Sequence, residues 1–103
     1  PCRAPPAVER ERAKGRSVIL VGDMNIAYQP EDQYKAIRVS AEEHAARPFV
    51  RWMAGLYVNY VDTWRFLNRE ESRRYTCWNQ KEQAFETNAG TRIDYVIVDR
   101  AFF

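Results

Sequence analysis

The sequence predicts an α/β fold, because two apolar runs of strand length lie on either side of a region with helical spacing. Residues 17–21 (SVILV) are apolar without alternation, which favours a central strand buried on both faces. Residues 46–56 show apolar side chains at helical spacing, and residues 92–98 (RIDYVIV) predict a final strand. With 103 residues the chain holds one domain at most, which excludes separate cofactor and substrate lobes.

Composition excludes several classes of protein. Hydrophobic residues make up 46% of the chain and aromatic residues 14%, which is too apolar for a disordered segment. The net charge of +2 indicates no particular partner. Cys2 and Cys77 lie far apart and outside any CxxC pair, so we expect neither a zinc finger nor a disulfide framework. Because no apolar stretch approaches the roughly 20 residues that span a bilayer, we expect no membrane partner.

The N-terminal part, residues 1–16, predicts a linker or insertion loop. It contains three of the five prolines, followed by a charged run without apolar periodicity. A solvated connector is the favoured interpretation, and contact of its basic residues with nucleic acid is the alternative.

The middle of the chain predicts an irregular stretch followed by a helix. Pro30 forces an extended or turn conformation within residues 23–39. Ser40 and Glu43 have the spacing of a capping box, which indicates a helix start. Since Pro48 weakens one continuous helix, residues 46–56 are the safer helical span.

The C-terminal half predicts short strands separated by polar loops. Residues 60–66 (YVDTWRF) are compatible with a strand or a short helical turn, and periodicity does not decide between them. Residues 67–73 are loop-like, and residues 74–79 predict a second strand. A polar loop is expected over residues 80–91, before the final strand.

Asp23 and Asn25 are the first candidate functional residues, because they directly follow an apolar strand. Functional groups gather where loops leave the carboxyl ends of strands in α/β sheets. Asp23 could bind a divalent cation or take a proton from water, and Asn25 could hydrogen-bond a phosphoryl oxygen without adding negative charge. The alternative is an ordinary turn closed by side-chain to backbone hydrogen bonds.

Asp94 is the second candidate. A carboxylate near the start of an otherwise apolar strand is costly to desolvate unless it is paired or faces a cleft. Arg92 lies on the same face at the two-residue period of a strand, so a structural ion pair is one explanation. A catalytic role, in which Asp94 orients a histidine, is the other.

The aromatic strand around Trp78 is the third candidate. Aromatic side chains next to Arg73 and Arg74 are typical of surfaces that stack on bases and bind phosphates, although core packing explains the aromatic residues equally well. His44, the single histidine, lies at the start of the predicted helix beside Glu42 and Glu43. We therefore expect His44 at the surface, with no catalytic role.

Four segments in this order carry a resemblance to a known family: VILVGDMNIA, YVDTWRF, YTCWN and NAGTRIDYVIVD. Together they resemble the endonuclease/exonuclease/phosphatase superfamily, and within it the exonuclease III-type abasic-site endonucleases. The match covers residues 17–99. The TCW run and the small residue before RIDY are most similar to the apurinic/apyrimidinic endonuclease 2 group.

The resemblance implies both a fold and an activity. Residues 17–103 would form the central to C-terminal part of an α/β domain, namely part of a four-layer sandwich of two packed β-sheets flanked by helices, incomplete at both ends. The implied enzyme is a Mg²⁺-dependent DNA repair phosphodiesterase, with Mn²⁺ as the alternative ion. Its implied substrates are DNA with abasic sites and DNA with blocked or recessed 3′ ends.

The resemblance also implies roles for the carboxylates. Asp23 matches the aspartate that activates the attacking water, and Asn25 matches the asparagine that supports it. Both match metal-binding positions. Asp94 matches the aspartate that orients a catalytic histidine.

A second set of positions is implied to contact DNA. Trp78 and Cys77 match residues that border the pocket for the abasic sugar. Thr91 and Arg92 match positions that face the DNA. A small residue at Thr91 favours 3′-end processing over incision at abasic sites.

Some functional residues of the family lie outside the 103 residues. They are a metal-binding Glu and an Asn before this region, and an Asp-His pair after it, so we expect the chain alone to be inactive. The alternatives are a non-catalytic nucleic-acid-binding remnant of the fold and a phosphatase of the same superfamily. DNA repair suggests a nuclear protein, or a mitochondrial one, and a sliding clamp could bind only through segments absent here.

Overall fold

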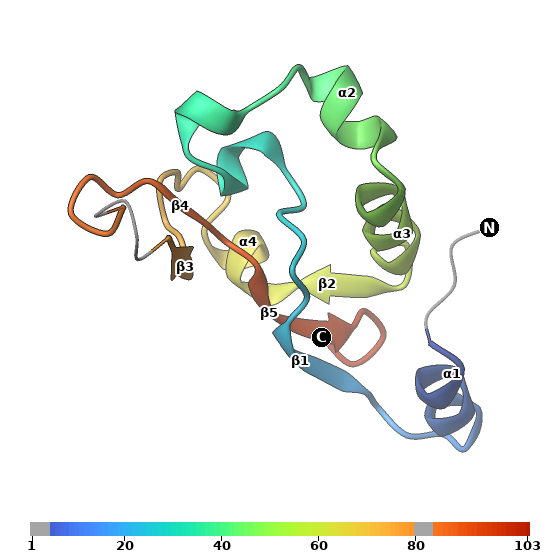
Figure 1. Cartoon of the computed structure of the whole chain (residues 1–103). Coiled ribbons are helices and arrows are strands. Elements are labelled where there is room, and N and C mark those ends of the chain that lie inside the picture. Colours follow the sequence, from blue (N-terminus) through green and yellow to red (C-terminus); the bar gives the residue numbers. More distant parts are fainter. Residues whose placement is uncertain (1–4, 80–83) are drawn as a thin grey trace.

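The computed structural model describes residues 5–79 and 84–103, and it confirms a mixed α/β fold (Figure 1). One antiparallel sheet has the strand order β1-β5-β2, so β5 is its central strand. A second antiparallel sheet pairs β3 with β4. The strands are β1 (Ile19–Asp23), β2 (Tyr60–Asp62), β3 (Cys77–Trp78), β4 (Gly90–Thr91) and β5 (Asp94–Asp99).

The helices begin where the sequence offers a cap or a proline. The Ser40 hydroxyl accepts a hydrogen bond from the Glu43 amide, which confirms the predicted helix start. Pro48 begins the next helix instead of interrupting it, because the first helical turn needs no proline N–H. The helical segments are α1 (Pro6–Ala13), the 3₁₀ turns η1 (Pro30–Asp32) and η2 (Lys35–Ile37), α2 (Ala41–Ala46), α3 (Pro48–Leu56) and α4 (Thr63–Leu67).

The loop predicted for residues 1–16 is wrong for the part that the structure describes, since α1 is a helix. Pro6 occupies its first turn. The Val8 side chain is buried in the core, and the Arg12 Nε donates to the Asp99 carboxylate at 2.9 Å. Val8 is the one buried side chain of α1, and the Arg12 guanidinium also lies over the Tyr60 ring. One buried residue and one arginine produce no periodic sequence pattern.

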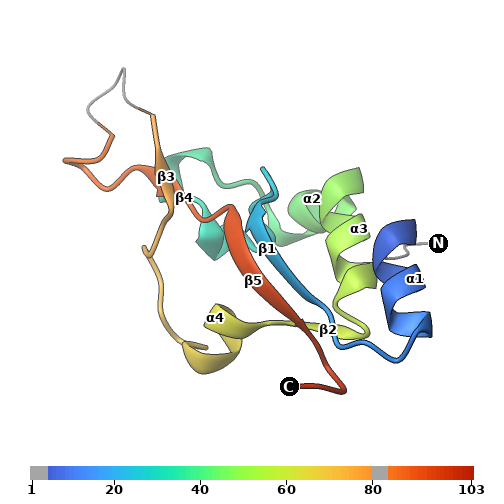
Figure 2. The ribbon, with the colours of Figure 1, turned by 90° about the horizontal axis from the view of Figure 1, so that it is seen from below.

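The hydrophobic core lies on one face of the three-stranded sheet. Met53 and Leu56 of α3 pack against Tyr60, Tyr95 and Ile97, and all five are at most 4% exposed. Figure 2 shows α1, α2 and α3 together on one side of this sheet, with β3 and β4 at the opposite end of the molecule from α1. The core therefore anchors β5, from which the candidate site extends.

The other face of β1 is open, which corrects the prediction of a central strand buried on both faces. Ile19 and Val21 are 51% and 67% exposed, and β1 is an edge strand among the described residues. Val21 lies opposite Val96, which is 47% exposed. A continuous apolar run indicates a sheet covered on both sides, whereas the described residues cover one side only.

The ambiguous segment at residues 60–66 contains both predicted alternatives in succession. β2 ends at Asp62, whose carboxylate accepts a hydrogen bond from the Arg65 amide and so caps α4. The strand predicted at residues 74–79 is shorter, and the final strand is shifted to Asp94–Asp99. Part of the loop predicted over residues 80–91 lies outside the described residues, and its last two residues form β4.

Candidate active site

Two carboxylates meet where β1 ends and β5 begins. Asp23 is the last residue of β1, and its antiparallel partner on β5 is Asp94. Directly opposed residues of an antiparallel pair project their side chains on the same face of the sheet. Both side chains are exposed. Because two opposed negative charges destabilise a strand pair, this arrangement is suited to a cation.

The backbone around Asp23 makes a sharp turn that is closed by hydrogen bonds. Gly22 and Asn25 have φ angles of 125° and 53°, which lie in the left-handed region. The Asn25 amide donates to the Asp23 Oδ1 at 2.7 Å, and the Met24 amide donates to the Ile93 carbonyl at 2.9 Å. The bond to Oδ1 is the one expected for an ordinary turn. Because this hydrogen bond occupies only one of the two carboxylate oxygens of Asp23, the turn is compatible with a functional role of the other oxygen.

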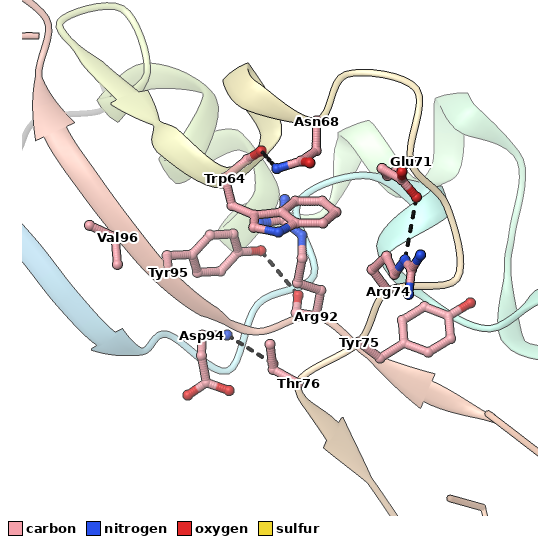
Figure 3. Close-up of a pocket in the computed structure, with 10 residues that line it drawn as sticks. All are labelled: Trp64, Asn68, Glu71, Arg74, Tyr75, Thr76, Arg92, Asp94, Tyr95 and Val96. Atoms are coloured by element: carbon pink, nitrogen blue, oxygen red, sulfur yellow. Dashed lines mark hydrogen bonds and ion pairs between the residues drawn. The ribbon is translucent and has the colours of Figure 1, made fainter. Parts of the chain in front are cut away.

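Asp94 is held by its backbone, while its carboxylate remains accessible. The Thr76 hydroxyl oxygen accepts hydrogen bonds from the Ile93 and Asp94 amides at 3.0 and 3.2 Å. Figure 3 shows the Asp94 carboxylate pointing away from Arg92. The alternative explanation, an ion pair between Arg92 and Asp94, is therefore wrong.

Arg92 belongs to a buried ion cluster instead. It is 3% exposed, its Nε donates to Asp32 Oδ1 at 2.9 Å, and its second terminal nitrogen donates to Asp62 Oδ2 at 2.7 Å. A second arginine, Arg65, also binds Asp32 Oδ1, at 2.8 Å. Burial lowers the pKa of Arg92, but the hydrogen bonds to Asp62 and Asp32 outweigh burial and keep this pKa above its ordinary value. These contacts commit Arg92 to the interior and argue against the expected contact with DNA.

Two aromatic rings enclose the Arg92 guanidinium. Its central carbon lies 5.0 Å from the Trp64 ring centroid and 4.9 Å from the Tyr95 ring centroid. The pKa of the Tyr95 hydroxyl is raised, chiefly by burial, so this hydroxyl stays protonated as a hydrogen-bond donor. The buried ion cluster thus holds Arg92 in place, two residues before Asp94, where β5 begins.

The sequence interpretation missed Asp32 and Asp62. A signal for Asp62 was present, because it is a carboxylate inside an apolar run, and the desolvation argument used for Asp94 applies to it equally. Asp32 carries no such signal. It lies in an irregular segment after Pro30, sixty residues from its partner Arg92.

A cavity of about 540 Å³ opens beside Asp94 (Figure 3). Its volume falls in the range of small-ligand pockets. Trp64, Tyr75, Thr76, Arg92, Asp94 and Tyr95 are among its lining residues. The site therefore combines an accessible carboxylate with aromatic walls and a hollow of ligand size.

The remaining predicted DNA-binding residues come together on the β3–β4 hairpin. Cys77 pairs with Thr91, and Trp78 pairs with Gly90. Cys77 is an exposed free thiol, whereas Trp78 and Thr91 are half-buried. The Trp78 Nε1 donates to the Asn88 side-chain oxygen at 3.1 Å, which fixes the indole plane. The structure thus places three of the four predicted DNA-binding residues on this hairpin, whereas the Arg92 side chain belongs to the buried ion cluster.

Gly90 is required by the close approach of this indole. A Cβ at position 90 would lie 2.6 Å from the Trp78 Nε1 and 2.8 Å from the Cys77 carbonyl oxygen. We expect Gly90→Ala to displace Trp78 and to lower the free energy of unfolding by about 1–3 kcal/mol, the usual cost of overpacking. Thermal unfolding followed by tryptophan fluorescence measures both effects. Unchanged emission and midpoint would contradict the prediction, and Ala89→Gly serves as a control in the same loop.

The donor chemistry at the two strand ends fits a hard divalent cation. Among the described residues, no three His, Cys, Asp or Glu side chains lie close enough to hold a metal on their own. Mg²⁺, however, commonly keeps several waters and takes only one or two protein carboxylates. Asp23 and Asn25 offer such oxygen donors, and Asp94 lies in register with Asp23. In the described part of the chain, no helix is long and apolar enough to cross a membrane.

Comparison with known proteins supports the resemblance, although no family model matches the chain. DNA-(apurinic or apyrimidinic site) endonuclease 2 from Mus musculus is 35% identical over an alignment of 100 residues that covers 86% of this chain and 19% of that protein. The exodeoxyribonuclease from Bacillus subtilis is 32% identical over an alignment of 90 residues that covers 84% of this chain and 34% of that protein. The chain thus spans about a fifth of the endonuclease 2 relatives that it matches.

Solved structures give the same answer for the fold. The catalytic domain of APE2 from Xenopus laevis superposes with a TM-score of 0.81 and 27% identity, over 90% of this chain and 30% of that one. The 3′ phosphatase NExo from Neisseria, bound to a product DNA hairpin, superposes with a TM-score of 0.74 and 25% identity, over 91% of this chain and 37% of that one. In sequence and in α/β fold, the chain therefore matches part of the catalytic domain of the exonuclease III-type abasic-site endonucleases.

Proposed function

We propose that the protein containing this chain is a metal-dependent DNA repair phosphodiesterase, which incises DNA beside abasic sites and processes 3′ ends. The observation that carries the proposal is the pairing of Asp23 with Asp94, two exposed carboxylates in register, of which Asp94 lines a cavity. Support comes from relatives named as an abasic-site endonuclease and an exodeoxyribonuclease. We propose nuclear residence, with mitochondrial residence as the alternative.

Each polar side chain has a defined task in this mechanism. Asp23 and Asn25 would hold Mg²⁺, with Mn²⁺ as the alternative ion. The bound cation supplies Lewis acidity that offsets the charge developing on the phosphoryl oxygens. Asp23 would accept a proton as the water oxygen bonds to phosphorus, and the bond from phosphorus to the leaving 3′ oxygen breaks, with solvent protonating that oxygen. The Asn25 amide donates to a phosphoryl oxygen. Asp94 is a positioning residue for a histidine that lies outside this chain.

The β3–β4 hairpin supplies the contact to the deoxyribose. We propose that Trp78 and Cys77 border the sugar pocket and that Thr91 faces the DNA beside them. Their grouping on one hairpin supports this assignment. Because Thr91 is small, it leaves open the space that a bulky side chain would fill against the duplex, which favours 3′-end processing over abasic incision. A clamp partner would have to bind segments outside this chain.

Hydrolysis by the complete protein tests the proposal. The substrates are labelled duplexes, one with an abasic-site analogue and one with a recessed 3′ end, each with Mg²⁺ and with excess chelator. We expect metal-dependent cleavage of both, faster on the recessed end. Binding of both duplexes without cleavage would overturn the proposal in favour of a non-catalytic remnant. Release of phosphate from inositol phosphates without DNA cleavage would favour a phosphatase.

A basic groove next to the hairpin predicts how the chain contacts the DNA backbone. The groove, of about 500 Å³, is lined by Lys35, Arg38 and Arg73, and no acidic residue is among the described side chains that line it. We expect Lys35→Ala combined with Arg73→Ala to weaken DNA binding. The slope of log K against log salt concentration should become shallower by about 2, since each lost phosphate contact contributes about 0.9.

Fluorescence anisotropy with a labelled duplex at several salt concentrations measures this slope. The charge-matched control is Arg10→Ala combined with Lys14→Ala, because α1 lies at the opposite end of the molecule (Figures 1 and 2). Equal changes of slope in the two double variants would show that overall charge, and not the groove, binds the phosphates.

A further inference from the structure

The segment that follows the Asp23 turn is tied to the sheet by one buried hydroxyl. Tyr95, on β5, is 4% exposed. Its hydroxyl donates to the Ile26 carbonyl oxygen at 2.6 Å and accepts from the Tyr28 amide at 3.1 Å. The Arg92 carbonyl oxygen lies 3.2 Å from the same hydroxyl. One side chain thus connects the segment after β1 with the segment that leads into Asp94.

A buried histidine holds the same segment from another element. His44, on α2, is 2% exposed, so the expectation that it lies at the surface is wrong. Its Nε2 lies 2.9 Å from the Ala27 carbonyl oxygen and 3.0 Å from the Tyr28 carbonyl oxygen. Since both partners are acceptors, Nε2 carries the proton and donates. The segment 26–28 is therefore fixed by hydrogen bonds from both Tyr95 and His44.

This segment continues directly from the residues assigned to the metal. Asn25 has a left-handed φ of 53°, a conformation that costs free energy and persists only when neighbouring contacts enforce it. Its preceding residue, Met24, is bonded to Ile93, and the residues that follow it are bonded to Tyr95 and His44. The position of Asn25 relative to Asp94 thus depends on the hydrogen bonds that hold the residues on either side of it.

We propose that Tyr95 and His44 are positioning residues that set the placement of Asp23 and Asn25 against Asp94, and thereby the affinity of the site for a divalent cation. The inference rests on the proposed function, because it assumes that Asp23 and Asn25 hold the ion. Mg²⁺ demands nearly ideal octahedral geometry, so a displaced ligand lowers affinity strongly. A misplacement of about 1 Å at a reacting centre lowers the rate by about 100-fold.

The chain offers a matched control for the Tyr95 hydroxyl. Tyr60 is 1% exposed and belongs to the same core, but its hydroxyl has no hydrogen-bond partner among the described residues. Tyr95→Phe and Tyr60→Phe each remove one buried hydroxyl and keep the ring. Only the first removes the ties to Ile26 and Tyr28.

The experiment compares these two variants in the complete protein. Paramagnetic broadening by Mn²⁺ at the amides of residues 23–25 reports cation binding independently of catalysis. Hydrogen exchange of the Tyr28 amide reports its hydrogen bond to the Tyr95 hydroxyl. For Tyr95→Phe we expect faster Tyr28 exchange, a cation concentration for half-saturation raised about 10-fold, and kcat lowered about 10- to 100-fold at an unchanged KM for DNA. Tyr60→Phe should match the wild type in all four measurements.

A second pair of variants keeps the test decisive if Tyr95→Phe does not fold. His44→Leu removes the donor, whereas His44→Gln keeps an N–H that can reach a carbonyl oxygen. Weaker Mn²⁺ binding in the Leu variant with recovery in the Gln variant would support positioning.

Two outcomes would overturn the inference, and they are distinguishable. In the first outcome, Tyr95→Phe and His44→Leu both exchange faster at Tyr28 but keep the cation affinity and the kcat of the wild type. That result would limit Tyr95 and His44 to a structural role. A wild-type protein that neither binds Mn²⁺ at residues 23–25 nor cleaves DNA would overturn the proposed function as well.

Discussion

Replacing Asp23 with asparagine is expected to lower kcat for hydrolysis of a recessed 3′ end by about 100- to 10,000-fold, the range over which a general base contributes. Asparagine cannot accept the proton of the attacking water, and it removes a negative charge that would bind the cation. It keeps an oxygen that can accept the hydrogen bond from the Asn25 amide. Since Asp23 is exposed and faces the like charge of Asp94, the thermal unfolding midpoint should not fall.

The assay uses labelled recessed-end and abasic duplexes with the complete protein and saturating Mg²⁺. Glu31→Gln is the matched control, because Glu31 is an exposed carboxylate on η1. Loss of cleavage in the Asp23 variant alone would place the chemistry at Asp23. Full activity in that variant would contradict the proposed mechanism, and equal inactivity of wild type and variant would favour a binding remnant.

Arg92→Met is expected to lower the free energy of unfolding by about 3–5 kcal/mol. Removing one partner of a buried ion pair leaves an uncompensated charge in the interior; here Asp62 loses its ion-pair partner, and Asp32 keeps Arg65 alone. The Asp32 side chain is fully buried and Asp62 is 9% exposed, so water cannot replace the guanidinium fully. Equilibrium unfolding in urea, followed by far-ultraviolet circular dichroism, measures the change.

Arg74→Met provides the comparison, because Arg74 pairs with Glu71 at the surface and its side chain is 67% exposed. An exposed pair contributes at most about 1 kcal/mol. Adding Asp62→Asn to Arg92→Met should restore part of the lost stability by removing one orphaned charge. A loss for Arg92→Met no larger than that for Arg74→Met would show that the cluster contributes little to folding.

Local patterns in the sequence predicted the helix start at Ser40, the approximate places of β1 and β5 and the candidate carboxylates, whereas both strands begin two residues later than predicted. Ser40 caps a helix as predicted, since a cap depends on residues within one turn. Asp23 and Asp94 were identified separately, one from its place after a strand and the other from the cost of burying a carboxylate. That they face one another in register depends on how β1 and β5 pair, and no local pattern contains this information.

Only the tertiary structure decided which polar side chains are buried together. Arg92 binds a carboxylate sixty residues away, and His44 binds carbonyls sixteen and seventeen residues away, so neighbouring residues could not indicate their burial. Val8 is the one buried residue of α1, which is too little to produce periodicity. Short-range order follows from backbone and capping preferences, whereas burial depends on which distant segments cover each face of the sheet, and that is determined only when the chain has folded.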